Sequence, residues 1–475
     1  MLRKFMSDPS QLIAAVQDRL GPRSVETDAG AIAPWLTDWR GRFHGQAAAI
    51  LLPGTTQEVA AMVGLAAQHR VPLVPQGGNT GMVGGATPPK DGSAVILSLR
   101  RMNRLRSISA EADLAVVEAG MILADLHGRA AEVGRRFPLT LGSRGSCTIG
   151  GLIATNAGGT QVLRFGTMRA LVAGVEAVLP NGSVHDGLTA LKKDNRGYSL
   201  DHLLIGSEGT LGIITAAALR LVPAVAARAV AWAAVADPQA ALDLLRQLQD
   251  QSDQIEGFEI IPDGSLQLVL EHIPGTRSPL TGKHQWHVLI EATSPDAADP
   301  PGAELERMLG EALAQGRIAD ATIAASEAQA EAFWRLRDSI SEAERATGGS
   351  IAHDISVPVD AMPRFMVAAA AGIEAKFPGV AASAFGHLGD GNVHFHVRMG
   401  NRPKNRSDAD APAITRMVHD LVTAAGGSIS AEHGIGQMKL AEFERLAPPG
   451  RIAALRAIKR ALDPAGLMNP GKLVR

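Results

Sequence analysis

The sequence contains a single cysteine, Cys147, among its 475 residues. One thiol excludes an internal disulfide framework and a Cys-rich zinc site, so we expect a reducing compartment and a cytoplasmic location. Aromatic residues are also few, and the formal net charge is only −2. The sequence has no basic stripe with interleaved aromatics, no apolar run of membrane-spanning length and no signal-peptide pattern. Neither a nucleic-acid partner nor a membrane span is therefore expected.

The order of helix-like and strand-like segments predicts an α+β protein with more than one domain. The two kinds of segment alternate through the first 222 residues, where glycine is frequent, and Ala-rich helical stretches alternate with strands after that point. A chain of this length is expected to form two or three domains. We therefore predict domains at 1–222 and 223–415 and a carboxyl-terminal segment at 416–475. The polar stretch 401–412 is expected to be an exposed loop.

Glycine is concentrated in three runs, at 75–85, 141–160 and 205–215. Such loops allow backbone amides to approach an anion, because glycine accepts positive φ and has no side chain to block the approach. Any one run is most simply a tight connection. Three runs within about 140 residues favour a long, phosphate-bearing cofactor that is contacted in several places. No G-x-G-x-x-G motif occurs, so the fingerprint of a Rossmann domain is missing.

Three histidines lie close together in AFGHLGDGNVHFHV, residues 384–397. Asp390-Gly391 predicts a two-residue hairpin turn, which would place His387 and His394 opposite each other with Cβ atoms ~5 Å apart. His396 and Phe385 would lie on the same face of the sheet. Two converging imidazoles favour a metal site over a polar sheet face or one buried core histidine.

Such a site needs a further ligand, preferably an oxygen donor. The stretch SISAEHGIG offers Glu432, followed by His433 and two glycines that would bend the chain. A solvated turn is the alternative for this pair.

Six motifs together resemble a known family. They are VPLVPQGGNTGMVGG, GSCTIGGLIATNAGG, KKDNRGYSLDHLLIGSEGTLGIIT, GHLGDGNVH, SAEHGIG and MNPGK, in this order from about residue 40 to the end. They resemble the FAD-dependent D-2-hydroxyacid dehydrogenases of the vanillyl-alcohol oxidase flavoprotein superfamily, and match the D-2-hydroxyglutarate branch better than the D-lactate branch. The resemblance implies a vanillyl-alcohol oxidase-type FAD-binding domain, an antiparallel-sheet substrate (cap) domain and a carboxyl-terminal helical segment.

The resemblance also implies FAD as cofactor. The FAD is expected to be non-covalent, because the first glycine run has neither a His nor a Cys that could tether it. The implied FAD contacts fall in the three glycine runs and near the carboxyl terminus: Pro75, Gly77, Gly78, Asn79, Thr80, Gly81, Gly85, Gly145, Ser146, Ile149, Gly150, Gly151, Thr155, Asn156, Gly159, Gly209, Ile214 and Asn469.

For the chemistry, the family pattern makes His387, His394 and Glu432 ligands of a divalent metal and His433 the general base. Nitrogen-rich ligation with one carboxylate suits Zn²⁺, with Mn²⁺ and Co²⁺ as alternatives. We expect the substrate's C1 carboxylate and C2 hydroxyl to bind the metal, and His433 to take the hydroxyl proton. Hydride transfer from C2 to flavin N5 would then give the 2-keto acid.

Substrate choice rests on fewer residues. Arg337 and Ser341 share one face of a predicted helix, and in the family the matching Arg helps to hold a distal carboxylate. A solvated helix arginine is an equal alternative from the sequence alone. The family pattern has Lys and Asn where this chain has Ala352 and His396, which weakens the case for a dicarboxylic substrate. D-2-hydroxyglutarate is still placed ahead of D-lactate or another D-2-hydroxy monocarboxylate.

Two other functional classes stay open at this point. A zinc hydrolase could use the two histidines and Glu432, but it would not need three glycine runs. A flavin-binding carrier or sensor would not need a metal beside a base. For the dehydrogenase, an electron-transfer flavoprotein or a quinone is the expected electron acceptor, with oxygen left open, and a homodimer is one expected assembly.

Overall fold

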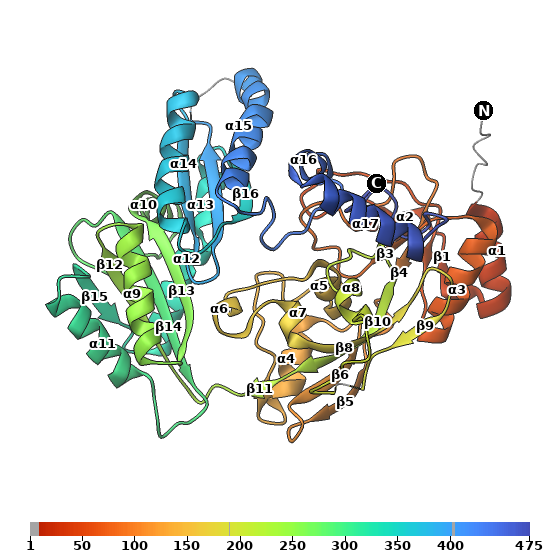
Figure 1. Cartoon of the computed structure of the whole chain (residues 1–475), viewed down its shortest axis with the longest axis horizontal. Helices are drawn as coiled ribbons and strands as arrows, with labels where there is room; N and C mark the ends of the chain where they lie inside the picture. Colours follow the sequence, from red (N-terminus) through yellow and green to blue (C-terminus); the bar gives the residue numbers. More distant parts are fainter. Residues whose placement is uncertain (1–8, 190, 401–403) are drawn as a thin grey trace. The chain divides into compact units, whose positions relative to one another are not determined.

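The computed structural model describes residues 9–189, 191–400 and 404–475, and these divide into two compact units (Figure 1). The first unit consists of the described residues within Met1–Gly159, Phe165–Pro223 and Glu432–Arg475. The second consists of Thr160–Arg164 and the described residues within Ala224–Ala431. The second unit thus continues beyond the expected boundary at 415, and only the residues after Ala431 return to the first unit.

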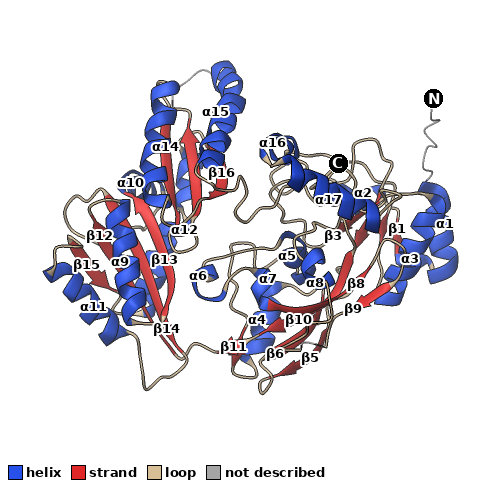
Figure 2. Cartoon of the chain, in the orientation of Figure 1, coloured by secondary structure: helices blue, strands red, loops and turns tan. Residues whose placement is uncertain are grey.

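The first unit is built on two main sheets (Figure 2). The smaller sheet has the order β1-β2-β4-β3, in which β2, β4 and β3 are parallel. The larger is an antiparallel sheet with the order β5-β6-β10-β8-β9. The strands of this unit, including the pair β7 and β11, are β1 Val25–Glu26, β2 Ile50–Leu51, β3 Leu73–Gln76, β4 Val95–Ser98, β5 Leu105–Ser109, β6 Leu114–Glu118, β7 Arg135–Arg136, β8 Val172–Val178, β9 Val184–Asp186, β10 Ile213–Arg220 and β11 Val222–Pro223.

The helices of the first unit include α3, which begins where the Thr55 hydroxyl accepts a hydrogen bond from Glu58 N at 3.1 Å. α3 then buries Val59, Met62 and Val63, at helical spacing, in the core of this unit. The helices, with α6 at the junction of the two units, are α1 Pro9–Leu20, η1 Pro22–Ser24, α2 Ala29–Ile32, η2 Ala33–Trp35, α3 Thr56–His69, α4 Leu123–Ala131, α5 Ile149–Thr155, α6 Val162–Phe165, α7 Met168–Leu171, α8 Leu200–Leu204, α16 Leu440–Leu446 and α17 Pro449–Leu462.

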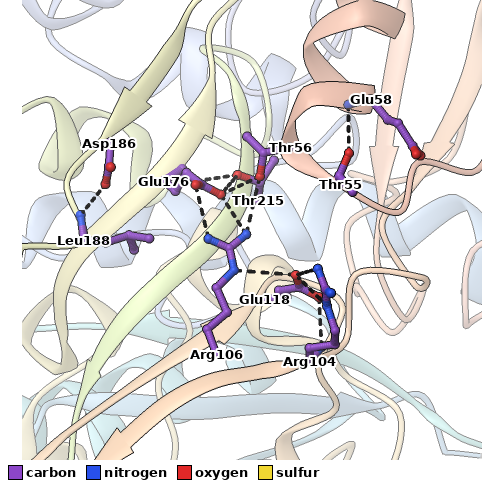
Figure 3. A network of polar contacts seen from close by, with 10 residues as sticks. All are labelled: Thr55, Thr56, Glu58, Arg104, Arg106, Glu118, Glu176, Asp186, Leu188 and Thr215. Atoms are coloured by element: carbon purple, nitrogen blue, oxygen red, sulfur yellow. Dashed lines mark hydrogen bonds and ion pairs between the residues drawn. The ribbon is translucent and has the colours of Figure 1, made fainter.

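An ion-pair network links the larger sheet to α3 (Figure 3). Glu118 of β6 has no exposed side-chain surface and binds Arg104 at 2.9 Å and Arg106 at 3.5 Å. Arg106 also pairs with Glu176 of β8 at 3.0 Å, and Glu176 accepts a hydrogen bond from Thr56 of α3 at 2.6 Å. Removing one partner would leave a buried charge uncompensated, so the network is part of the unit's framework.

The second unit is an antiparallel seven-stranded sheet with helices on both faces (Figure 2). Alternate residues of β12 enter different cores: Ala231 belongs to the cluster that also contains residues of α9, α11, α14 and α15, whereas Trp232 belongs to the cluster that contains residues of α10, α12 and α13. In sheet order, the strands are β15 Asp320–Ile323, β12 Ala227–Val235, β14 Trp286–Ser294, β13 Ile255–Pro262, β17 Ala381–His387, β18 Asn392–Arg398 and β16 Ser350–Ser356. The helices are α9 Pro238–Gln251, α10 Asp263–His272, α11 Gly302–Ala314, α12 Glu327–Asp338, α13 Ile340–Ala346, α14 Met362–Lys376 and α15 Lys404–Ala424.

Helix α15 replaces most of the exposed loop that we expected at 401–412, whose first three residues lie outside the described ranges. Ile414, Val418 and Val422 recur every four residues and are fully buried. Their burial on one helix face outweighs the helix-breaking tendency of Pro412. In the ranges that the structure describes, none of the helices combines the length and apolar character that crossing a membrane requires.

Candidate active site

The three glycine runs come together in the first unit. A Cβ atom on Gly78 would lie 1.9 Å from Ser146 O, so the first and second runs are in direct backbone contact. Gly209 of the third run has a φ of +71°, and a Cβ there would lie 3.0 Å from a ring carbon of Pro75. Only glycine permits these approaches. The expected convergence of the runs on one place is therefore present in the structure.

The carboxyl-terminal motif MNPGK joins the same cluster through Asn469. Asn469 Nδ2 donates hydrogen bonds to Gly85 O at 3.0 Å and to Glu208 O at 2.7 Å, which belong to the first and third runs. Its backbone N–H donates to Leu73 O of β3 at 2.8 Å. Asn469 thus joins the carboxyl-terminal segment to the first and third glycine runs.

Three polar atoms in this cluster are buried without a hydrogen-bond partner: Thr148 Oγ1, Asn469 Oδ1 and Gln76 Oε1. Gly77 faces the first of them, since its Cβ would lie 2.1 Å from Thr148 Oγ1. Buried polar atoms normally find partners, and a bound polar cofactor would supply them. The residues present therefore fit a cofactor with phosphate and ring polar groups.

Not every expected FAD contact faces this cluster through its side chain. Ile149 and Ile214 are buried in the hydrophobic core of the first unit. A Cβ on Gly159 would lie 2.3 Å from Thr140 O, so protein packing alone requires that glycine. Asn156 ends α5 with a φ of +50°, and its side chain accepts a hydrogen bond from Arg169 N at 2.9 Å.

The histidine hairpin β17–β18 lies in the second unit, and its register differs from our prediction. His387 pairs with Asn392, and Phe385 pairs with His394, so the turn contains residues 388–391 and the predicted two-residue turn is wrong. The longer turn is stabilised by the Asp390 carboxylate, which accepts a hydrogen bond from Asn392 N at 2.9 Å. His387 and His394 are diagonal neighbours, and their ring centroids are still 5.3 Å apart.

Both imidazoles point at one nitrogen of Arg337, from α12. Arg337 Nη2 lies 3.4 Å from His387 Nε2 and 3.2 Å from His394 Nε2. Glu259 of β13 binds Arg337 Nε at 2.8 Å and accepts a short hydrogen bond from His387 Nδ1. Because His387 Nδ1–H donates its hydrogen bond to Glu259, the other ring nitrogen, Nε2, is the acceptor in the neutral imidazole.

Burial and neighbouring charges have opposite effects on the pKa of Glu259 in the cluster of Glu259, Arg337, His387 and His394. Burial disfavours the charged form of Glu259, but the adjacent Arg337 and His387 outweigh it and hold the pKa of Glu259 well below its ordinary value. Burial, together with the positive charge of Arg337, lowers the pKa of His394 well below that of a free histidine. The cluster thus combines a carboxylate, a guanidinium and a neutral His394.

Among the residues that the structure describes, no group of three or more His, Cys, Asp or Glu side chains is arranged to hold a metal ion. The four residues expected to act together are divided between the units. His387 and His394 belong to the second unit, and Glu432 and His433 to the first. Within the second unit, the structure therefore brings the histidine pair together.

The two expected substrate residues on the predicted helix 333–346, Arg337 and Ser341, do not share a continuous helix. α12 ends at Asp338 and α13 begins at Ile340, with Ser339 between them, so the predicted single helix face is wrong. Arg337 is largely buried against the histidines, whereas Ser341 is exposed. Ser339 makes no side-chain capping hydrogen bond, and its backbone links the two helices by donating to Arg335 O at 3.1 Å and accepting from Ala343 N at 2.9 Å.

His396 lies on the same sheet face as His394 but has a carboxylate partner of its own. Its Nδ1 lies 2.5 Å from Glu344 Oε2, and Ser350 Oγ donates to the same oxygen at 3.0 Å. Glu344 Oε1 is buried with no hydrogen-bond partner. Ala352 is directly opposite His396 in the ladder, so the structure has no cation at that position.

Our sequence analysis missed three buried carboxylates: Glu208, Glu259 and Glu344. Glu208 stands in a glycine-rich run and Glu259 in a largely apolar strand, whereas Glu344 lies in the charged stretch ISEAERA, which carries no such signal. Carboxylates are rarely buried unless paired, so the two glutamates in the largely apolar strand IEGFEIIP could have indicated buried partners, although not which ones.

Comparisons with known proteins agree with this architecture. Residues 47–187 match the family described as "FAD binding domain", and residues 225–473 match "FAD linked oxidases, C-terminal domain". Among solved structures, the chain resembles an alkyldihydroxyacetonephosphate synthase, with a TM-score of 0.75 at 18% identity over 99% of this chain and 86% of the other. It also resembles a p-cresol methylhydroxylase, with a TM-score of 0.74 at 16% identity over 98% and 96%.

Curated relatives match over nearly the whole chain. The mitochondrial D-2-hydroxyglutarate dehydrogenase of Arabidopsis thaliana is 36% identical over 99% of this chain and 82% of its own length. The D-2-hydroxyglutarate dehydrogenase of Xanthomonas citri pv. viticola is 36% identical over 98% of this chain and 97% of its own length. The chain therefore belongs to the FAD-dependent D-2-hydroxyacid dehydrogenases.

Proposed function

We propose that this enzyme oxidises D-2-hydroxyglutarate to 2-oxoglutarate. Support comes first from the relatives of that name, which are similar over nearly their whole length. The structural observation that carries the proposal is the position of Arg337, whose guanidinium lies between His387 and His394 on one sheet face. A planar guanidinium is well suited to binding a carboxylate, and 2-hydroxyglutarate has two.

The residues of the chain have the following proposed roles. Bound FAD, held non-covalently by the glycine cluster, supplies the two-electron acceptor. Arg337 binds a substrate carboxylate, with His396 nearby and Ser341 retained as a weaker candidate. His433 accepts the C2 hydroxyl proton, a task for which a neutral imidazole is suited near neutral pH.

We also propose a divalent metal at His387 and His394, with Glu432 as the third ligand. The histidine pair supports this proposal because its two Nε2 atoms converge, here on Arg337 Nη2, whose place a bound metal would take, and because the carboxylate of Glu259 fixes the tautomer of His387. Zn²⁺ suits these ligands best, with Mn²⁺ and Co²⁺ as alternatives. A metal here would polarise the C2 hydroxyl and lower its pKa.

The second candidate is a D-2-hydroxy monocarboxylate such as D-lactate. It is favoured by the buried carboxylate of Glu344 beside His396, with Ala352 opposite, because the position opposite His396 carries no positive charge for a distal carboxylate. We infer that an electron-transfer flavoprotein or a quinone accepts the electrons, as expected for a dehydrogenase of this family.

Anaerobic titration of the metal-replete holoenzyme tests these candidates. D-2-hydroxyglutarate, D-lactate and their L enantiomers are added separately, and loss of the oxidised flavin absorbance is followed. We expect bleaching by D-2-hydroxyglutarate at far lower concentration than by D-lactate, and none by the L enantiomers at similar concentrations. Bleaching by D-lactate at lower concentration than by D-2-hydroxyglutarate would contradict the first candidate and support the second, a D-2-hydroxy monocarboxylate.

A further inference from the structure

Glu208 occupies an unusual backbone position in the third glycine run. Its φ is +52°, in a region that non-glycine residues seldom adopt, and its side chain is 8% exposed. Its backbone N–H donates to Ala154 O at 2.8 Å, and its carbonyl accepts from Asn469 Nδ2 at 2.7 Å. A strained residue persists only where its surroundings fix it, and here they do so from both sides.

The carboxylate of Glu208 binds the turn of the H-G-I-G motif. Oε1 accepts a hydrogen bond from Ile435 N and Oε2 accepts one from Gly436 N, both at 2.7 Å, across 227 and 228 residues of sequence. Gly434 permits this approach, because a Cβ there would lie 2.9 Å from Glu208 Oε1. Hydrogen bonds from backbone amides to a carboxylate are stronger than neutral ones.

Backbone hydrogen bonds with Val83 and Leu473 also fix the same turn. Val83 O accepts hydrogen bonds from Gln437 N at 3.1 Å and Met438 N at 3.2 Å, and Leu473 N donates to Gly436 O at 3.1 Å. Lys472 is also buried near the carboxylate: burial lowers the pKa of Lys472 to about 8, against the opposing effect of Glu208. The turn is therefore a fixed part of the first unit.

His433 immediately precedes this turn, so the backbone that carries its imidazole continues directly into the bound residues. We propose that Glu208 is a positioning residue for His433, which holds the H-G-I-G turn so that the imidazole stays aligned with the substrate hydroxyl. The inference rests on the proposed function, in which His433 takes the hydroxyl proton. A shift of about 1 Å in a catalytic group can cost about 100-fold in rate.

The test is a double-mutant cycle on the holoenzyme. Glu208→Gln keeps the shape of the side chain but replaces one acceptor oxygen with an amide donor that faces a backbone N–H. We expect Glu208→Gln to retain FAD, to leave the apparent substrate Kd unchanged, and to slow the limiting rate of flavin reduction about 100-fold. His433→Ala should slow it by at least ~100-fold. The double variant should be no slower than His433→Ala alone, because residues that act as a unit are not additive.

A purely structural role for Glu208 predicts a different result. The two losses would then multiply, and the double variant would be slower than His433→Ala by the full Glu208→Gln factor; this result, or an unchanged rate in Glu208→Gln, overturns the positioning role. An unchanged rate in His433→Ala contradicts the proposed base itself, which separates failure of the proposed function from failure of the inference. The reductant is whichever hydroxy acid bleaches the unaltered enzyme.

Two further variants keep the test decisive. Glu118→Gln alters a fully buried carboxylate of the same unit that binds Arg104 instead of the turn, and it should leave the reduction rate unchanged. An equal loss in Glu118→Gln would show a general effect of buried carboxylates and overturn the proposal. If Glu208→Gln fails to fold, Gly434→Ala pushes Oε1 away from the turn without altering Glu208, and the same non-additivity with His433→Ala is expected.

Discussion

Single residues decide how the histidine pair is oriented, and Glu259 is the clearest case. Glu259→Gln would weaken the acceptor for His387 Nδ1–H and leave Arg337 without its carboxylate. Residues that orient metal-binding histidines typically contribute ~10–100-fold to metal affinity. We therefore expect a loss of that size, measured by competition with a chelator. Glu291→Gln on the neighbouring strand, whose carboxylate pairs with Arg228, is the matched control and should keep the affinity. Equal weakening in both variants would contradict the orienting role.

Residue 352 provides a direct test of substrate choice. Ala352→Lys would place a cation opposite His396 in the ladder, near the carboxylate that pairs with it. If the distal substrate carboxylate reaches this region, a charge-assisted hydrogen bond should tighten binding of D-2-hydroxyglutarate by about 10-fold. The measurement is the apparent Kd from flavin bleaching, with D-lactate unchanged. Ala352→Met adds length without charge and should not tighten binding. If Ala352→Lys does not tighten binding of D-2-hydroxyglutarate, the distal carboxylate of the substrate does not bind near residue 352.

At the scale of elements, the β17–β18 hairpin depends on the backbone of its turn. Gly391 has a φ of +81°, and a Cβ there would lie 2.1 Å from Val357 O, which is backbone and cannot move aside cheaply. Gly391→Ala should therefore lower the free energy of unfolding by about 1–3 kcal/mol, seen as a lower midpoint in urea unfolding. Gly310→Ala, in the exposed interior of α11 with nothing within 4 Å, should instead raise stability by about 0.5–1 kcal/mol. Similar midpoints for the two variants would refute this account.

Several elements were predictable because their signals are local. Asn181-Gly182 is typical of a hairpin turn, and β8 and β9 pair there with Val178 opposite Val184. The apolar spacing of residues 58–70 is typical of an amphipathic helix, which the structure contains as α3. The hairpin of the histidines was predicted as an element but not in register, because the Asp390 carboxylate stabilises a longer turn than Asp390-Gly391 alone would form. Helix α15 was missed because polar residues at its start conceal the apolar stripe that follows.

At the scale of the whole molecule, FAD is expected to be bound without a covalent link, so it should dissociate from the chain when the protein unfolds. Cys147 is buried, and burial raises the pKa of its thiol, which disfavours the reactive thiolate. The first glycine run offers no His or Cys. Acid precipitation should therefore release all flavin into the supernatant, measured by absorbance. Flavin retained in the washed pellet would show a covalent link, and peptide mapping would then identify the residue.

The sequence by itself determined the cofactor class, the order of the motifs and most regular elements. These features depend on properties of short stretches: glycine where the backbone must approach closely, and apolar residues at a regular period. The tertiary structure alone decided the partners of the buried charges. Glu259 meets His387 across 128 residues, and Glu208 meets Ile435 across 227. Neither pairing can be predicted from local sequence spacing. The paired residues belong to strands and turns far apart in the sequence, and they meet only when the chain folds.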